Sequence, residues 1–163
     1  DKAFAQPGRQ LFDVPEHGPW RLVVPELQAH FKMANLRPLT EENLAFLARK
    51  AFGVNQAVDS DQQLQWTQFA KNSLPSLLHH KMSFFEWFYV NLKLTRDHLA
   101  ELWKEQLIFG FIGKRETERL LRTKPPGTFL LRFSESAKNG GVTIAVHRGE
   151  GHVQHLSPLT AAE

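Results

Sequence analysis

The spacing of apolar residues changes near residue 104, and this change most limits the folds open to the chain. In the first hundred or so residues, apolar side chains recur every three or four positions, as they do on one face of an α-helix. Beyond that point they come in short or alternating runs of strand length, separated by turns rich in Gly and Pro. A helical part followed by antiparallel strands predicts an α+β fold, with the boundary between residues 104 and 110.

Helix ends are marked most clearly in "PLTEENLAFLARKAFG". Thr40 is a candidate N-cap, two acidic residues follow it, and Gly53 stands at the far end. These signals predict a helix over residues 41–52. The side chains expected to point inward from this helix are Leu44, Phe46, Leu47, Ala51 and Phe52.

Other helix signals flank this one. "LQWTQFAKN" predicts a short helix with Trp66 and Phe69 turned inward, and another helix is expected after Pro25. "MSFFEWFYVNLKLTRDHLAELWKEQ" predicts a long helical stretch with a break near Thr95, where a second N-cap fits. The polar residues 55–63 predict a loop. The apolar face of the long stretch consists of Phe84, Phe85, Trp87, Phe88, Leu92, Leu99 and Trp103.

The second part of the chain combines one helix with three strands. "KRETERLLRT" predicts a helix, and the breaker "KPPG" separates it from the strand "TFLLRFSES". "VTIAVHR" and "HVQHLSP" predict two further strands, and "KNGG" and "GEG" are the turns between them. The order predicts a central antiparallel sheet with a flanking helix.

Composition excludes several classes of protein. The chain has 163 residues and is 42% hydrophobic, which is enough for a buried core. It has no cysteine, so disulfides and thiolate metal sites are excluded. Its net charge is only +3, which does not indicate nonspecific binding to nucleic acid. No run of about 18 apolar residues is present to form a membrane helix.

A single charged residue interrupts the apolar strand "TFLLRF". Alternation of side chains assigns one face to Phe129, Leu131 and Phe133, and the other to Leu130, Arg132 and Ser134. The first face is expected to be core. Arg132 either lies on a solvent-exposed face or, as the neighbouring Leu130 suggests, lies on a covered face. A covered guanidinium needs an anion, because burial of an unpaired charge costs several kcal/mol.

The residues around this arginine suit an oxyanion. Ser134, Glu135 and Ser136 stand where the strand opens into a turn, and their hydroxyl and amide groups can surround a tetrahedral anion. Lys114 and Arg115 open a helix where acidic residues are usual, which suits an anion bound at that helix end. The alternative is an ordinary serine-rich turn.

The segment "GFIGKRETERLLRTKPPGTFLLRFSESAKNGGVTIAV" closely resembles the SH2 domain of the signal transducer and activator of transcription (STAT) family. "LTEENLAFLARKAFG", "WTQFAKNSLP" and "FFEWFYVNLKLTRDHLAELW" resemble the helical linker domain that precedes it in those proteins. The resemblance implies a linker domain over residues 1–106 and the N-terminal part of an SH2 domain over residues 107–163, with the rest of that domain missing.

Carried over position by position, the resemblance implies a phosphotyrosine site and the residues that form it. Arg132 matches the arginine that holds the phosphate with two hydrogen bonds, and Lys114 matches a second cation. Gln154 aligns near the side wall of the pocket. Glu118 stands where the family often has a basic residue, which makes the pocket less positive. The implied site consists of Arg132, Lys114, Ser134, Glu135, Ser136, His155 and Ser157.

The resemblance also implies a function without catalysis or a cofactor. Members of this family dock to phosphorylated receptors and to the phosphorylated tails of partner STAT proteins in cytokine (JAK–STAT) signalling, then move from cytoplasm to nucleus and regulate transcription. DNA contacts are expected from domains outside this chain. The full-length protein is expected to dimerise, whereas this chain is not expected to do so by reciprocal phosphotyrosine docking. Tyr89, its only tyrosine, is expected to be a packing residue.

Several alternatives remain open from the residues. The chain could be a structural linker with a non-functional pocket, or its helical part could contact DNA directly. A hydrolase is disfavoured because Ser134 and Ser136 lack a G-x-S-x-G pattern. A metal site is disfavoured because His79 and His80 are adjacent, and because His152 and His155 should point to opposite faces of a strand. An incomplete SH2 domain is also expected to leave one sheet face uncovered.

Overall fold

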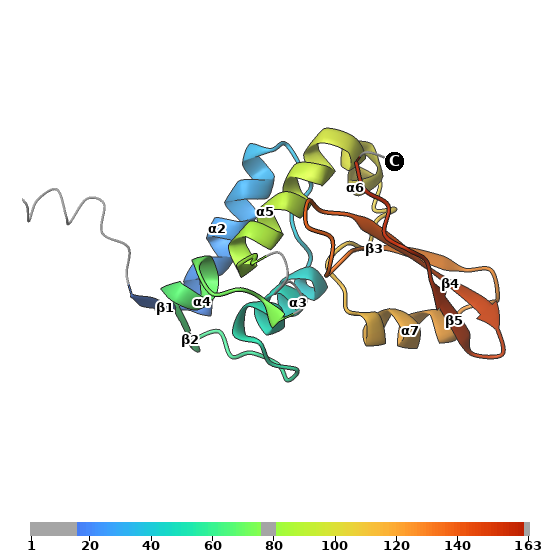
Figure 1. Cartoon of the computed structure of the whole chain (residues 1–163), viewed down its shortest axis with the longest axis horizontal. Helices are drawn as coiled ribbons and strands as arrows, with labels where there is room; N and C mark the ends of the chain where they lie inside the picture. Colours follow the sequence, from blue (N-terminus) through green and yellow to red (C-terminus); the bar gives the residue numbers. More distant parts are fainter. Residues whose placement is uncertain (1–15, 76–80, 162–163) are drawn as a thin grey trace, which may run out of the picture.

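Helices form the first part of the chain, and a three-stranded sheet with one helix forms the second (Figure 1). The computed structural model describes residues 16–75 and 81–161. Together with the antiparallel sheets, this arrangement confirms the predicted α+β fold. The helical elements are α2 (Trp20–Met33), α3 (Glu41–Phe52), α4 (Trp66–Ala70), α5 (Phe84–Leu94), the π-helical η2 (Thr95–Leu99), α6 (Ala100–Lys104) and α7 (Lys114–Arg122). The strands are β1 (His17–Pro19), β2 (Gln63–Gln65), β3 (Phe129–Phe133), β4 (Val142–Gly149) and β5 (His152–His155).

Helix α3 has the ends that its sequence predicts. The Thr40 hydroxyl accepts a hydrogen bond from the Asn43 amide (3.1 Å), and the Asn43 side chain accepts one from the Thr40 amide (3.1 Å). At the other end Gly53 adopts the left-handed conformation, with φ of 67°. These capping groups satisfy backbone donors and acceptors locally, so neighbouring residues alone define the helix.

Helix α2 begins earlier than predicted. It starts at Trp20, so Pro25 lies inside the helix rather than before it. The Trp20 and Arg21 amides donate to the carbonyls of Gln62 (3.0 Å) and Ser60 (2.8 Å), which supplies first-turn partners from a distant segment. Trp20 is also buried in the core. These tertiary contacts outweigh the one helical hydrogen bond that a proline cannot make.

The prediction of a second N-cap at Thr95 was wrong. The Thr95 side chain is fully buried, and its hydroxyl donates to the Asn91 carbonyl four residues earlier (2.8 Å). The chain therefore stays helical and passes through one π-helical turn before α6. Elsewhere in this part, Trp66 and Phe69 of α4 are only half-buried, although the Phe69 ring packs 5.2 Å from that of Phe85.

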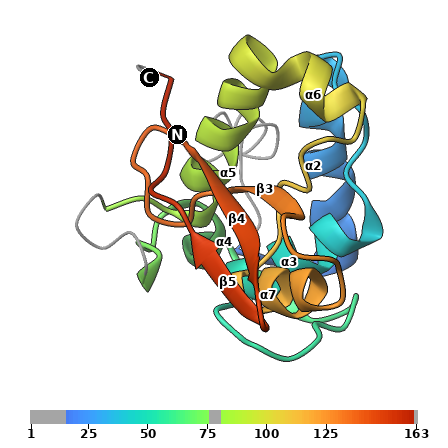
Figure 2. The same cartoon turned by 90° about the vertical axis from the view of Figure 1, so that its right-hand side faces the viewer.

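The sheet has the predicted order β3–β4–β5, with antiparallel neighbours. Arg132 of β3 pairs with Thr143 of β4, and Ala145 of β4 pairs with His155 of β5. Helix α7 runs along one face of this sheet (Figures 1 and 2). The face that α7 covers is the one that carries Arg132.

The prediction that Phe129, Leu131 and Phe133 form the core face of β3 was only partly right. Phe133 is buried in the helical core, and Leu131 packs against it, but Phe129 is 62% exposed. On the opposite face, Leu130 is buried in a smaller cluster beneath α7. The helices reach only the Phe133 end of the strand, so Phe129 lies beyond their cover.

One hydrophobic core crosses the boundary predicted between residues 106 and 107. Phe111 and Phe133 lie 4.7 Å apart between ring centroids, and Phe133 stacks on Trp103 of α6 at 6.1 Å. Gly110 lets this approach occur, because a Cβ atom there would lie 2.7 Å from the Trp103 ring. The two parts are therefore packed against each other through a shared core. The division into a linker domain over residues 1–106 and an SH2 domain over residues 107–163 stays a prediction.

Candidate anion-binding site

Arg132 is a buried cation whose guanidinium has no hydrogen-bond or ion-pair partner among the described residues. Its residue is 7% exposed, and its Nε atom is buried without a hydrogen bond among the described residues. No ion pair of its guanidinium occurs within residues 16–75 and 81–161. Burial lowers the pKa of Arg132, while the carboxylates of Glu135 and Glu118 act in the opposite direction. A guanidinium remains charged even so, and a buried charge of this kind is stabilised when an anion binds to it.

The loop after β3 presents a backbone donor, the Glu135 amide, that has no acceptor among the described residues. The Ser134 hydroxyl accepts hydrogen bonds from the amides of Ser136 and Ala137 (3.2 Å each), which folds the loop into a tight turn. The Ser134 amide donates to the Gly141 carbonyl (2.8 Å). The amide of Glu135 makes no hydrogen bond within the part of the chain that the structure describes, so it can donate to a ligand. Ser136 is exposed beside it.

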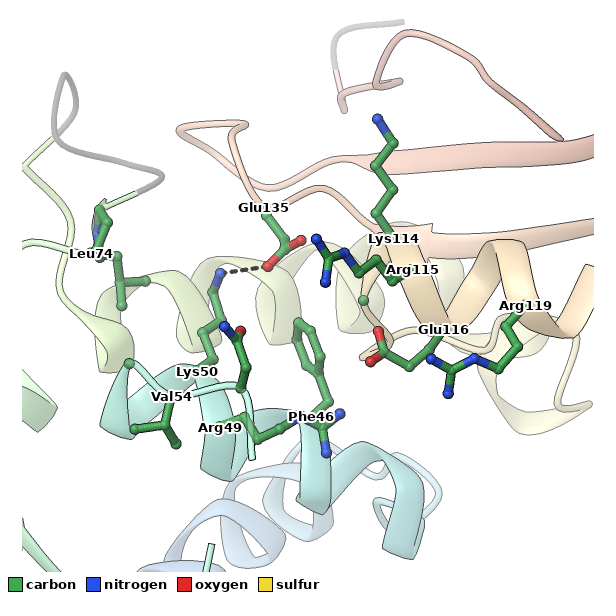
Figure 3. A pocket seen from close by; sticks show the side chains of 14 residues that line it. Phe46, Arg49, Lys50, Val54, Leu74, Lys114, Arg115, Glu116, Arg119 and Glu135 are labelled. Atoms are coloured by element: carbon green, nitrogen blue, oxygen red, sulfur yellow. Dashed lines mark hydrogen bonds and ion pairs between the residues drawn. The ribbon is translucent and has the colours of Figure 1, made fainter. Parts of the chain in front are cut away.

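Lys114 and Glu118 lie one turn apart on α7. Lys114 is exposed at the first position of the helix, and Figure 3 shows that it extends away from Arg119. Glu118 accepts a hydrogen bond from His155 Nε2 (2.9 Å), and this contact lowers the pKa of its carboxyl, assisted by the charges of Arg122 and Lys114. The carboxylate at position 118 therefore lies beside the sheet face of Arg132.

The residues from the third strand divide between the two sheet faces. His155 pairs with Ala145 and points toward α7, whereas Gln154 lies on the other face, where it accepts a hydrogen bond from Arg148 Nε (2.7 Å). This position takes Gln154 away from Arg132. The Leu156 amide donates to the Ile144 carbonyl (2.9 Å), so the chain continues beside β4 beyond His155. Ser157 is exposed, and the register of the sheet continues to place it opposite Thr143, which in turn pairs with Arg132.

A cleft of about 640 Å³ opens between α3 and α7, next to this loop (Figure 3). Its basic lining residues come from both parts of the chain, and two carboxylates, Glu116 and Glu135, lie among them. Glu135 points into the cleft and pairs with Lys50 Nζ at 3.0 Å. The basic residues of the lining are Arg49, Lys50, Lys114, Arg115 and Arg119.

Sequence reasoning missed three residues beside the site. Thr143 is 4% exposed and pairs with Arg132, and the alternation of "VTIAVHR" would have placed it on that face. Lys50 falls four residues after Phe46 on the apolar side of α3, which is an unusual place for an ammonium group. Trp87 donates a hydrogen bond to the Ser134 carbonyl, but the sequence pattern around it predicted only that its side chain is buried.

The remaining candidates give no second site. Among the described residues, no three His, Cys, Asp or Glu side chains are grouped to hold a metal ion. His79 and His80 lie outside the described residues. Tyr89 lies on α5 and its ring stacks on Phe85 at 6.3 Å, but it is 41% exposed, so packing involves only part of its side chain. None of the helices in the described ranges is long and apolar enough to cross a membrane.

Comparison with known proteins gives two family matches and a similar relative. Residues 7–88 match the family model for the linker domain of signal transducers and activators of transcription. Residues 107–163 match the model for the SH2 domain. A protein of Anopheles gambiae named "Signal transducer and transcription activator" is 39% identical over 169 residues. That alignment covers all of this chain and 23% of the relative, so the chain spans about a quarter of the relative's length.

Proposed function

The chain belongs to the family of signal transducers and activators of transcription, and we propose that its SH2 domain binds phosphotyrosine through Arg132. This family consists of signalling proteins and transcription factors rather than enzymes, which contradicts the hydrolase alternative. The chain is a STAT-type signal transducer that contains an SH2 sequence. The ligand, the residues that hold it and the partners that carry it belong to the proposal.

The observation that carries this proposal is the Arg132 guanidinium on a covered sheet face, which has no hydrogen-bond or ion-pair partner within residues 16–75 and 81–161. A phosphotyrosine has a charge of about −1.5 to −2 and three acceptor oxygens at pH 7. The planar fork of arginine can donate two parallel hydrogen bonds to such a group. An unmodified tyrosine is neutral at pH 7 and offers a single hydroxyl oxygen as acceptor, so phosphorylation would act as the switch for binding.

The surrounding groups complete a pocket of the right chemistry. The amide of Glu135 and the hydroxyls of Ser136 and Thr143 can donate to phosphate oxygens, and Lys114 supplies a second positive charge at the exposed edge. We assign His155 and Ser157 to the side wall that faces the rest of the ligand. Glu118 opposes the positive charge, which makes this pocket weaker than one with a basic residue at that position.

The proposed partners follow from the family. We propose that the ligands are phosphotyrosine segments of receptors and of partner STAT tails in cytokine signalling, with movement from cytoplasm to nucleus after activation. The name of the Anopheles gambiae relative, which combines signal transduction with transcription activation, supports this role. We further propose that the whole protein dimerises by reciprocal docking.

Calorimetric titration with a phosphotyrosine peptide and its unphosphorylated twin tests the proposal. We expect measurable affinity only for the phosphopeptide, and Arg132→Ala should weaken binding by about 2 to 5 kcal/mol, because it removes the buried member of a charge pair. Arg132→Lys should also weaken binding, since lysine cannot form the two-pronged contact. Equal affinity for both peptides would leave the alternative of a structural linker with a non-functional pocket.

A further inference from the structure

The loop that follows β3 lies against the helical part as well as the sheet. Trp87 of α5 donates a hydrogen bond from Nε1 to the Ser134 carbonyl (3.1 Å), and both residues are buried. At the other end of the loop, a Cβ atom added to Gly140 would lie 3.0 Å from the Val90 carbonyl of α5. The beginning and the end of this loop are therefore both seated on one helix of the linker part.

A second contact comes from α3. The side chain of Lys50 is only 8% exposed, and its ammonium lies 3.0 Å from Glu135 Oε1 and 4.3 Å from the centre of the Trp87 ring. Burial lowers the pKa of Lys50, and the Glu135 carboxylate opposes that effect. The ion pair, together with the cation–π contact, compensates the ammonium for much of its lost hydration. Figure 3 shows Lys50 and Glu135 meeting at the edge of the cleft.

This ion pair determines where the Glu135 carboxylate points. Glu135 stands three residues after Arg132, and its charge, followed by that of Glu118, opposes the lowering of the Arg132 pKa by burial. A carboxylate that lost its partner would be attracted to the buried Arg132 guanidinium, which has no ion pair in the part of the chain that the structure describes. If Glu135 turned toward Arg132, it would occupy the donors needed by a phosphate and would repel the phosphate charge.

We propose that Lys50 and Trp87 of the linker part are positioning residues for phosphotyrosine binding by the SH2 part. Lys50 holds the Glu135 carboxylate away from Arg132, and Trp87 fixes the Ser134 carbonyl so that the Glu135 amide stays directed at the ligand. The inference rests on the proposed function of the Arg132 pocket. It makes the linker part a contributor to affinity although neither side chain touches the phosphate.

A rescue experiment separates positioning from stability. The affinity of the whole chain for a phosphotyrosine peptide is measured by calorimetry for the unaltered protein, Lys50→Met, Glu135→Gln and Lys50→Met/Glu135→Gln. We expect Lys50→Met to weaken binding about tenfold, because the freed carboxylate competes with the phosphate. The double variant should return to within about threefold of the unaltered protein, because a neutral glutamine does not compete. Glu135→Gln alone keeps the backbone amide proposed to donate to the phosphate and removes a nearby negative charge, so it should strengthen binding by up to about threefold.

Arg49→Met is the matched control. Arg49 neighbours Lys50 on α3 and lines the same cleft, and its replacement by methionine changes the net charge by the same amount. Arg49 has no ion pair among the described residues, so its loss frees no carboxylate. We expect its effect on affinity to stay below about twofold. Trp87→Phe keeps an aromatic ring in the core but removes the N–H donor, and it should weaken binding several-fold; this variant also serves if Lys50→Met fails to fold.

The outcomes are distinguishable. Unchanged affinity in Lys50→Met, or equal weakening in the single and double variants, would overturn the positioning role and leave the proposed function intact. Absence of phosphopeptide binding by the unaltered protein would overturn the proposed function, and this inference with it.

Discussion

Arg132 places the needs of folding and of binding in conflict at a single residue. A buried charge without a partner destabilises a folded protein, because it has lost its hydration and gained no compensating contact. The backbone of Arg132 is held by regular sheet pairing with Thr143 of β4. The residue therefore stays in this covered position although burial of its charge lowers the stability of the fold. Such a conflict is typical of binding sites, where function is retained at some expense of stability.

We therefore predict that Arg132→Leu stabilises the folded chain while it abolishes phosphopeptide binding. Replacement of buried ionic groups by well-packed apolar residues is often neutral or stabilising, by up to about 4 kcal/mol. Urea unfolding followed by tryptophan fluorescence measures the change. Arg115→Leu is the control, since Arg115 is exposed and should shift the free energy of unfolding by less than about 0.5 kcal/mol. A less stable Arg132→Leu protein would show that the guanidinium has a stabilising partner.

We predict that the Glu118 carboxyl makes the free energy of unfolding depend on pH in the acid range. Its pKa is lowered from the usual value of 4.5, chiefly by the hydrogen bond from His155. A group whose pKa is lower in the folded state stabilises the fold above its unfolded pKa, and this stabilisation is lost as pH falls through the folded value. We expect the free energy of unfolding to fall between pH 5 and pH 3 by less in Glu118→Gln than in the unaltered protein. Identical pH profiles from urea unfolding would contradict this assignment.

At the scale of elements, local chemistry predicted some boundaries and missed others. The ends of α3 were predicted correctly, because they depend on Thr40 and Gly53, whose capping groups act on neighbouring residues. The start of α2 depends on hydrogen bonds from Trp20 and Arg21 to a segment some forty residues away, and no local pattern contains that information. The π-helical turn begins at Thr95, whose buried hydroxyl donates to the Asn91 carbonyl, and burial at this position is decided by packing.

The connection between α6 and α7 depends on Gly110. This residue has φ of 82°, and an added Cβ atom would lie 2.7 Å from the Trp103 ring and 3.1 Å from that of Phe133. We expect Gly110→Ala to destabilise the chain by about 2 to 4 kcal/mol, the sum of left-handed backbone strain and overpacking. Gly127→Ala is the control, because Gly127 also has positive φ (94°) but has open space around it. Chemical denaturation should show at least about 1 kcal/mol between the two variants; equal losses would mean that the ring contact is relieved at no cost.

At the scale of the molecule, the linker part and the SH2 part share one hydrophobic core. Phe111, Phe133 and Val142 of the second part belong to the same cluster as Trp87 and Trp103 of the first. Neither part can unfold without exposing apolar surface of the other. The Lys50–Glu135 pair and the hydrogen bond from Trp87 to Ser134 add polar contacts across the same interface.

We accordingly predict a single cooperative unfolding transition. Trp20 and Trp66 pack against Phe52 and Phe69 of the first part, so their indole N–H resonances report on the linker helices. The methyl resonances of Val142 and Val146 report on β4 of the SH2 part. In a urea titration, the two signals should change at the same midpoint, because both parts lose the shared core together. Two separate midpoints would show that the parts fold independently.

The sequence by itself determined the features that depend on neighbouring residues. These are the capped helix 41–52, the order of three antiparallel strands, and the position of Arg132 on the strand face opposite Phe133, whereas the burial of that guanidinium was left open. Only the tertiary structure decided which end of β3 is covered, that Gln154 lies on the face away from Arg132, and that Glu135 pairs with Lys50, 85 residues earlier. The physical reason is that capping and alternation act over a few residues, whereas burial and ion pairing depend on which distant segments meet.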